Sequence, residues 1–292
     1  MEIVRKLPKT FYICVLNFKG GVGKTTTSTH LAYYLATILG YRVLLVDCDM
    51  QANSSSGLTK EIDGATLTNV LKGEIPLHHA IRKVRENLYL VPADYDLDTA
   101  SKHIISSGMG GYTLLSRSLK AMEKGKQIPE LDKKFDPTQS PLTPLSECIF
   151  DIVIFDNAGF SSTTESALYA SDSILAPVEM EYFSYEGIFM MMDKLESTMA
   201  SMGRELDVLG VVPYNIDERF KMTRSYSVSL KKEYEIETTV PIRTDAAVKY
   251  AQPKAQTVFE FEPNCNAAKD FKALGDQILE RIKESLAEAS RG

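Results

Sequence analysis

Short runs of apolar, mostly β-branched and aliphatic residues recur along the chain, and polar or glycine-rich residues follow them. The clearest runs occupy residues 12–16, 42–46, 150–155 and 208–212. A strand that is buried on both faces, as in a parallel sheet, needs a nearly continuous apolar sequence of this kind. The pattern therefore predicts several central strands of a largely parallel sheet.

Apolar residues with helical spacing stand between and after these runs. In residues 24–39, Leu31, Leu35 and Ile38 recur at i, i+4 and i+7, and Gly40 follows as a helix stop. A strand, this helix and the next strand form a βαβ unit. A final helix carries one apolar stripe, made of Phe271, Leu274, Ile278, Ile282 and Leu286. We expect a doubly wound α/β fold, with a mainly parallel sheet and helices on both faces.

Length and composition favour one large domain. The chain has 292 residues, 44% of them hydrophobic, which is enough to bury a large core. We expect a single domain over residues 1–292. Residues 125–147 are rich in proline and charge and predict a loop or insertion. A solvated surface excursion is favoured there, and a docking site for a partner is the alternative.

Charge and cysteine usage narrow the function classes. The net charge of −6, from 33 basic and 39 acidic residues, argues against a protein that binds nucleic acid over most of its surface. It still permits a local basic patch. The four cysteines are scattered, which fits reduced thiols. Neither a bilayer-spanning segment nor a signal peptide is apparent. We expect a soluble, cytoplasmic protein.

The stretch Asn17–Thr26 reads Asn-Phe-Lys-Gly-Gly-Val-Gly-Lys-Thr-Thr and joins the first predicted strand to the first helix. Glycines there let backbone N–H groups converge on phosphate oxygens at the positive end of a helix. A lysine adds charge on the β- and γ-phosphates, and a hydroxyl completes a Mg²⁺ shell. The alternative is a glycine-rich turn with solvated lysines. The predicted nucleotide-binding residues are Lys19, Gly20, Gly21, Val22, Gly23, Lys24, Thr25 and Thr26.

The loop departs from the strict phosphate-loop pattern, because Phe18 replaces a glycine and Lys19 stands at its head. In this form it resembles the deviant-Walker-A ATPases of the ParA/MinD superfamily. The resemblance implies ATP and Mg²⁺ as ligands and an ATP-dependent homodimer. It also implies that Lys24 acts in its own subunit, while Lys19 reaches the nucleotide of the partner subunit.

A second block, from Asp47 to Asn53, resembles the Asp-x-Asp-Pro-Gln motif of the same family, with Met50 in place of proline. Ligands of open α/β sheets bind at the carboxyl ends of strands, so both carboxylates are expected to face the phosphates. The resemblance implies that Asp49 orients or activates the attacking water, and that Asp47 supports Lys24 and the metal shell. A polar strand end that caps the next helix is the alternative.

The Walker B position follows the strand at 150–155. Asp156 is expected to bind Mg²⁺, so Thr25, Asp47 and Asp156 are the predicted metal residues. Asn157-Ala158-Gly159 stands where partition ATPases usually have a proline pair. At this position the sequence departs from the partition-ATPase pattern and is more similar to MinD-like loops.

The C-terminal third carries the remaining site candidates. A block after a late strand resembles the family and implies that Asn215 bonds an adenine edge. ATP-bound dimers of the family bind DNA without sequence preference through arginines and lysines of this region. An ordinary solvated helix face is the alternative. The candidates by position are Arg219, Arg243, Lys249 and Lys254.

The resemblance thus implies a slow Mg²⁺-dependent ATPase that coats DNA in its ATP state and moves or spaces a cargo. Plasmid or chromosome partition is the favoured role, in the nucleoid-associated part of the cytoplasm. A ParB-like centromere-binding or cargo-adaptor protein is expected to stimulate hydrolysis. About ten residues precede the first strand, so we expect no N-terminal helix-turn-helix domain.

Two other classes remain open. One is a MinD-like or carboxysome-type positioning ATPase that acts on a membrane or a protein cargo. Membrane binding through the last helix is disfavoured by its acidic residues Asp276, Glu280, Glu284 and Glu288. The other is a metal-cluster protein of the nitrogenase iron-protein type, and the lack of ligand cysteines after Asp156 argues against it.

Overall fold

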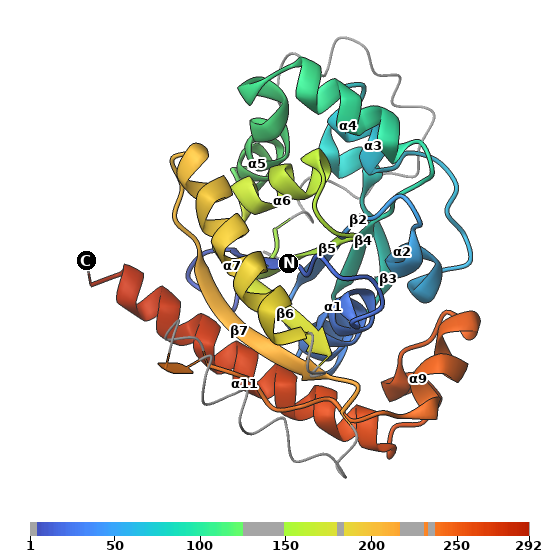
Figure 1. Cartoon of the computed structure of the whole chain (residues 1–292). Coiled ribbons are helices and arrows are strands. Elements are labelled where there is room, and N and C mark those ends of the chain that lie inside the picture. Colours follow the sequence, from blue (N-terminus) through green and yellow to red (C-terminus); the bar gives the residue numbers. More distant parts are fainter. Residues whose placement is uncertain (1–4, 125–148, 180–183, 217–230, 233–236, 292) are drawn as a thin grey trace.

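A seven-stranded sheet forms the centre of the protein (Figure 1), with the strand order β3-β4-β2-β5-β1-β6-β7. The computed structural model describes residues 5–124, 149–179, 184–216, 231–232 and 237–291. Neighbouring strands are parallel except β3 and β4, which are antiparallel at one edge. The predicted doubly wound, mainly parallel fold is therefore confirmed. The strands are β1 (Phe11–Val15), β2 (Val43–Cys48), β3 (Arg82–Arg85), β4 (Leu88–Val91), β5 (Ile152–Asn157), β6 (Ser173–Glu179) and β7 (Asp207–Tyr214).

Helices cover both faces of this sheet. On one face the strands pack mainly against α1 (Lys24–Tyr33), α9 (Ala246–Ala251), α10 (Val258–Phe261) and α11 (Asn266–Ala289). The other face is covered by α3 (Leu67–Leu71), α4 (Leu97–Ser106), α5 (Met109–Glu123), α6 (Ser162–Ala170) and α7 (Ser184–Ser201). Shorter elements complete the described chain: α2 (Asn53–Leu58) and the helical turns η1 (Tyr34–Ile38), η2 (Leu77–Ala80) and η6 (Gln252–Lys254).

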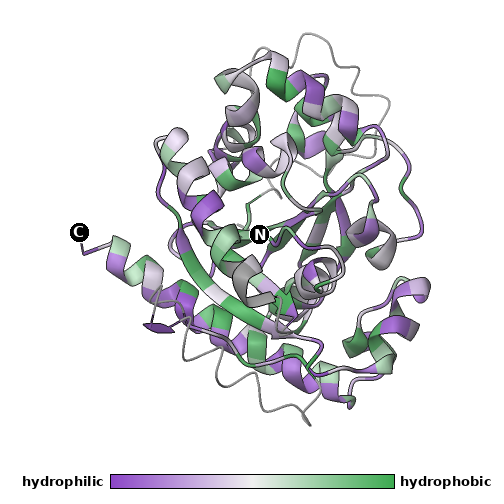
Figure 2. Ribbon diagram, in the orientation of Figure 1, coloured by the Kyte–Doolittle hydropathy of each residue, from purple (hydrophilic) through white to green (hydrophobic). Residues whose placement is uncertain are grey.

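The central strands are buried on both faces, as their continuous apolar sequences predicted. Ile13 packs with α1 and α11, whereas its neighbour Cys14 packs on the opposite face with α7, and neither is exposed. Figure 2 shows hydrophobic strands in the interior and hydrophilic residues alternating with hydrophobic ones along α11. Residues 125–148, which contain the predicted insertion, lie outside the described residues.

The C-terminal helix packs onto the sheet through the stripe that the sequence predicted. Phe271, Leu274, Ile278 and Ile282 are fully buried in the cluster that includes α1. No helix in the described part of the chain is both long and apolar enough to cross a membrane. The apolar face of α11 is therefore used to close the core.

The predicted helix over residues 24–39 is present, but it changes its winding near the middle. After α1 the chain continues as the π-helical turn η1 and then reaches Gly40, whose φ of 74° ends the helix as expected. The wider turn carries Tyr34, whose ring lies against Gly275 of α11. Its hydroxyl donates a hydrogen bond to Asp276 over 2.6 Å. The change of winding thus coincides with close packing between the two helices.

His30 joins α1 to the C-terminal segment through both ring nitrogens. The Val258 backbone N–H donates to Nε2 over 3.0 Å, so the proton is on Nδ1, which donates to the Thr26 carbonyl over 2.7 Å. The imidazole also stacks on Phe271, with 4.6 Å between ring centroids. Burial lowers the pKa of His30 to about 4. These contacts hold the ring in its neutral form.

Acid should therefore destabilise the fold through His30. The unfolded histidine gains a proton below its ordinary pKa of 6.5, whereas the folded one stays neutral down to about 4, so stability falls as the pH drops between these values. Between about pH 7.5 and about pH 5 we expect a loss of about 2 kcal/mol in the free energy of unfolding. Urea titrations at both pH values measure it.

The matched pair of variants is His30→Gln and His103→Gln, because His103 is exposed on α4. His30→Gln should show a smaller pH dependence than the unmodified chain, and His103→Gln should show the same dependence. An unchanged pH dependence in His30→Gln would contradict the assignment.

Candidate functional site

The glycine-rich loop leaves the carboxyl end of β1 and leads directly into α1. Gly21 and Gly23 have positive φ angles of 77° and 88°, which side chains other than glycine rarely adopt. Gly23 is the residue before the first turn of α1, so the free N–H groups of that turn face the loop. This arrangement can hold phosphate oxygens.

Asn17 anchors the start of this loop. Its Nδ2 donates to the Pro177 carbonyl over 2.8 Å, and its Oδ1 accepts from the Lys19 backbone N–H over 2.9 Å. Pro177 belongs to β6, so the anchor ties the loop to the neighbouring strand. The sequence alone did not assign this role to Asn17, although its place directly after an apolar strand was a usable signal.

The Lys24 side chain is buried under the loop and bonds the loop itself. Nζ donates to the Lys19 carbonyl over 2.8 Å. Burial lowers the pKa of Lys24, while the charges of Asp156 and Asp49 raise it. A phosphate oxygen that replaced the carbonyl would receive a charge-assisted hydrogen bond in a partly desolvated place.

Asp47 and Asp156 lie side by side at the ends of β2 and β5, where the two residues are paired in register. Both carboxylates are completely buried. Burial is the largest cause that raises each pKa, and for Asp47 the charge of Asp156 adds to it. Two carboxylates this close disfavour simultaneous ionisation unless a cation compensates them.

Hydroxyl groups surround these carboxylates. Ser55 donates to Asp47 from its backbone N–H over 2.9 Å and from Oγ over 2.6 Å. Asp156 accepts from Ser28 Oγ over 3.0 Å and from the hydroxyl of Ser54. The three serines were missed from the sequence, because each lies on a helix and comes close only in the folded chain.

The donor set fits Mg²⁺. This ion prefers oxygen ligands and is usually held by one or two carboxylates together with waters and substrate phosphates. The side chain of Thr25, which was predicted as a metal residue, lies close enough to Asp156 to oppose the rise in the pKa of this carboxyl. Among the described residues there is no group of three or more histidine, cysteine or acidic side chains arranged as a complete metal cage. The geometry therefore suits a metal ion shared with phosphate oxygens.

A cavity of about 320 Å³ connects the loop with the strand ends. Asp49 lines it and is half-buried, and its Oδ1 accepts from the Gln51 backbone N–H over 2.9 Å. The other lining residues come from the loop, from α1, from the ends of β5 and β7, and from the chain after β2. They are Gly20, Gly21, Gly23, Lys24, Thr25, Thr26, Gln51, Asn53, Ala158 and Tyr214.

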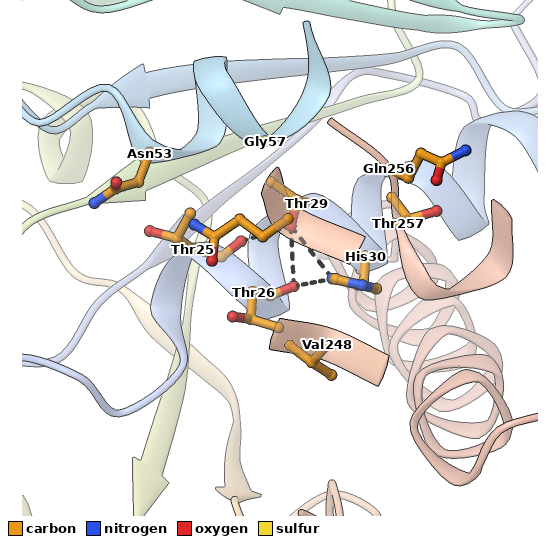
Figure 3. Close-up of a pocket in the computed structure, with 10 residues that line it drawn as sticks. Thr25, Thr26, Thr29, His30, Asn53, Gly57, Val248, Gln256 and Thr257 are labelled. Carbon is orange, nitrogen blue, oxygen red and sulfur yellow. Dashed lines mark hydrogen bonds between the residues drawn. The ribbon is translucent and has the colours of Figure 1, made fainter. Parts of the chain in front are cut away.

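A smaller pocket lies beside this cavity, between α1, α2 and the C-terminal segment (Figure 3). Thr25, Thr26 and Asn53 line both spaces. On its far side the pocket is closed by His30, Thr257 and other residues of 248–257. The first turn of α1 therefore borders both the cavity and the pocket that the C-terminal segment closes.

Lys19 lies on the surface of the loop, with 52% of its side chain exposed. Its Nζ is 3.6 Å from Glu179 Oε2 at the end of β6. Glu179 Oε1 accepts from Asn215 Nδ2 over 2.9 Å, and Asn215 Oδ1 accepts from Thr244 Oγ1 over 2.9 Å. Asn215 thus uses its amide within the protein, whereas its neighbour Tyr214 lines the cavity.

The predicted basic residues differ in their surroundings. Arg243 forms a two-pronged ion pair with Asp270, with Nε–Oδ2 and Nη2–Oδ1 distances of 2.9 and 2.7 Å. Lys249 is exposed on α9. Lys254 is also exposed, and its Nζ lies 4.2 Å from the centroid of the Phe261 ring. Arg219 lies outside the described residues.

Similar proteins are found over nearly the whole chain. The chromosome-partitioning ATPase Soj of Thermus thermophilus is 30% identical over 275 residues, which cover 94% of this chain and 97% of Soj. The cell division protein PomZ of Myxococcus xanthus is 28% identical over 280 residues, covering 94% of this chain and 79% of PomZ. A solved complex of an McdA variant from Cyanothece with ATP superposes with a TM-score of 0.73 at 22% identity, covering 94% and 96% of the two chains.

The family described as an AAA domain matches residues 10–208. That range includes the phosphate loop, both strand-end carboxylates and Asp49. Together with the match to Soj over nearly the full length of both proteins, it shows the family directly. The chain therefore belongs to the ParA-type P-loop ATPases of the ParA/MinD superfamily.

Proposed function

We propose that this protein hydrolyses Mg·ATP to partition or position a cargo, and that it works as an ATP-dependent dimer on DNA. The observation that carries the nucleotide part is that Lys24 and Asp49 line one cavity at the carboxyl edge of the sheet, next to the buried Asp47–Asp156 pair. The similarity to Soj and PomZ supports the choice of partition or positioning as the role.

In this proposal the loop N–H groups and Lys24 bind the phosphates, and Lys24 exchanges the Lys19 carbonyl for a phosphate oxygen. Thr25, Asp47 and Asp156 hold the metal, directly or through water. Bound Mg²⁺ supplies charge neutralisation on the phosphate oxygens. Phosphoryl transfer to water depends mainly on positioning and electrostatic stabilisation, so these residues need no covalent chemistry.

Asp49 is the residue proposed to orient the attacking water. It lines the cavity and is only half-buried, so its carboxylate can reach a water there. The backbone around it is held on both sides, because its N–H donates to Asp47 and its carboxylate accepts from the Gln51 N–H. This is the geometry of a positioned carboxylate on a fixed strand end.

Asp49→Ala should keep ATP binding and lose hydrolysis. A positioned general base or water-orienting group contributes about 100-fold or more to the rate, so we expect at least that loss in turnover. ATP affinity is measured by calorimetry and turnover by phosphate release. Lys24→Ala is the contrasting variant and should abolish binding itself. Turnover of Asp49→Ala at the unmodified rate would refute the role.

Lys19 is proposed to act on the nucleotide of the partner subunit, which requires it to leave Glu179. That ion pair has a distance of 3.6 Å and a lysine more than half exposed, so it holds Lys19 only weakly. Its exposure also leaves the ammonium accessible to a second subunit. Glu179 would then compete with the partner's phosphates for Lys19.

Substitutions of Lys19 and of Glu179 should change ATP-dependent dimerisation in opposite directions. Lys19→Ala is expected to prevent the ATP-dependent dimer. Glu179→Gln is expected to form it at up to about fivefold lower ATP concentration, because an exposed ion pair contributes about 1 kcal/mol at most. Sedimentation with ATP and Mg²⁺ measures both. Asp98→Asn, which breaks the exposed pair with Lys102 on α4, is the matched control.

Non-specific DNA binding is proposed for the basic residues of the C-terminal third. The contacts of Arg243 with Asp270, together with a side-chain exposure of only 29%, favour a structural contribution from this residue. Lys249 and Lys254 are exposed on neighbouring turns and are better placed to meet phosphates. Arg219 remains a candidate from the sequence.

Lys249→Ala combined with Lys254→Ala should weaken ATP-dependent binding of a random-sequence duplex and reduce its salt dependence, since fewer counterions are released. Fluorescence anisotropy over a salt series measures this. Arg243→Ala should instead lower the melting temperature, because it removes the guanidinium and leaves Asp270 only the backbone N–H of residue 243. If the unmodified chain binds no DNA in any nucleotide state, the DNA part of the proposal fails and the ATPase part stands.

The remaining partner is proposed to be a ParB-like or cargo-adaptor protein that stimulates hydrolysis, with the chain located on the nucleoid. A MinD-like membrane role is less favoured, because the apolar stripe of α11 is buried against the core. A positioning ATPase of the carboxysome type, which acts on a protein cargo, stays the second candidate.

A further inference from the structure

Two aromatic rings join the phosphate loop to the loop that follows β5. Phe18 stands directly before Lys19, and Phe160 stands directly after Gly159. Their ring centroids are 5.3 Å apart and the ring planes are inclined by 78°, which is the edge-to-face arrangement that aromatic pairs favour. Both side chains are half-buried and pack against the core cluster that contains residues of β1, β6 and α7. The pair therefore connects two loops that are far apart in the sequence.

Phe18 is the middle residue of a tight turn in the phosphate loop. Asn17 Oδ1 accepts a hydrogen bond from the Lys19 backbone N–H over 2.9 Å, so the asparagine side chain closes the turn over the residue that follows it. The Lys19 carbonyl accepts from Lys24 Nζ over 2.8 Å. The same turn therefore fixes the Phe18 ring and the backbone around Lys19.

The loop after β5 is fixed to the helices on that face of the sheet. The Gly159 carbonyl accepts from Thr164 Oγ1 over 2.7 Å, and Ser161 Oγ accepts from the Thr164 backbone N–H over 3.2 Å as the N-cap of α6. Lys194 of α7 places its Nζ 5.2 Å from the centroid of the Phe160 ring, within the range of a cation–π contact. Phe160 thus links the phosphate loop to α6 and α7.

The two loops also approach one another beside the cavity. A Cβ atom on Gly159 would lie 3.8 Å from the Phe18 carbonyl oxygen, so the two backbones are close. Ala158 lines the 320 Å³ cavity together with Lys24 and Asp49. The backbone at residues 158 and 159 therefore borders the space proposed for the phosphates and the attacking water. A displacement of this loop would move a wall of the cavity.

We propose that Phe18 and Phe160 are positioning residues for hydrolysis, because their contact sets the distance between the phosphate loop and the loop after β5. The inference rests on the proposed nucleotide binding at this loop. Both phenylalanines belong to the described residues and neither lines the cavity, so they act through the backbone and not on the ligand. Phosphoryl transfer depends mainly on positioning, so a small displacement lowers the rate more than the affinity for ATP.

The test is a double-mutant cycle in the full chain, with Phe18→Ala, Phe160→Ala and both together. Each single substitution should lower turnover at saturating Mg·ATP by about tenfold and change the Kd of Mg·ATP by less than about threefold. Because the two rings act through one contact, the double variant should be no slower than the slower single variant. Phosphate release measures turnover and calorimetry measures the Kd. Phe18→Leu and Phe160→Leu keep part of the contact and should lose less, and they form the same cycle if an alanine variant does not fold.

Tyr169→Ala is the matched control. This tyrosine is half-buried on α6, and the guanidinium carbon of Arg204 lies 5.5 Å from the centroid of its ring, but it is at the opposite end of α6 from Ser161. Turnover of Tyr169→Ala should stay within about twofold of the unmodified chain. A fall as large as in Phe160→Ala would trace the effect to lost stability and overturn the inference.

Three other results would overturn the inference: unchanged turnover in both single variants, a Kd that rises as much as turnover falls, or single losses that multiply to about a hundredfold in the double variant. In each case the unmodified chain still binds and hydrolyses Mg·ATP, so the inference fails alone. If the unmodified chain binds no Mg·ATP, the proposed nucleotide function fails with it.

Discussion

Two buried carboxylates held next to one another are the constraint on which the site depends. The register of β2 and β5 puts Asp47 beside Asp156 in the middle of the sheet, without solvent exposure. Serine hydroxyls stabilise part of this charge, but burial and the charge of Asp156 still raise the pKa of Asp47. A divalent cation would compensate it more fully, and the positive end of α1 and Lys24 lie close by. The two residues proposed to hold the metal therefore also belong to the packed central strands.

The phosphate loop is held by contacts that a ligand can replace. Lys24 bonds a loop carbonyl, and Lys19 pairs with Glu179, which in turn accepts from Asn215. Each of these contacts uses a group that phosphate oxygens or a second subunit would also engage. Because the Lys19 pair is exposed, exchanging it costs little. The loop can therefore be ordered in the absence of a nucleotide and still bind one.

The C-terminal segment is connected to the same loop through α1. His30 bonds both the first turn of α1 and Val258, and Arg243 is fixed to α11 by Asp270. A basic residue in this region can therefore contribute to the fold, to binding, or to both, and its neighbours decide which. Arg243 and Lys249 are only a few residues apart, yet one is paired with a carboxylate on α11 and the other is exposed on α9.

The sequence by itself determined the fold class, the phosphate loop and the strand-end carboxylates. Continuous apolar strands and the spacing of glycines and lysine are local signals, because burial on two faces and a positive φ each constrain the residue at that position. Only the tertiary structure showed what meets these residues: the serines around Asp156, the carboxylate partner of Arg243 and the ring of Tyr214 on Gly23. Such contacts join residues that are 27 to 191 positions apart. These contacts depend on strand order and helix packing, which no local sequence pattern specifies.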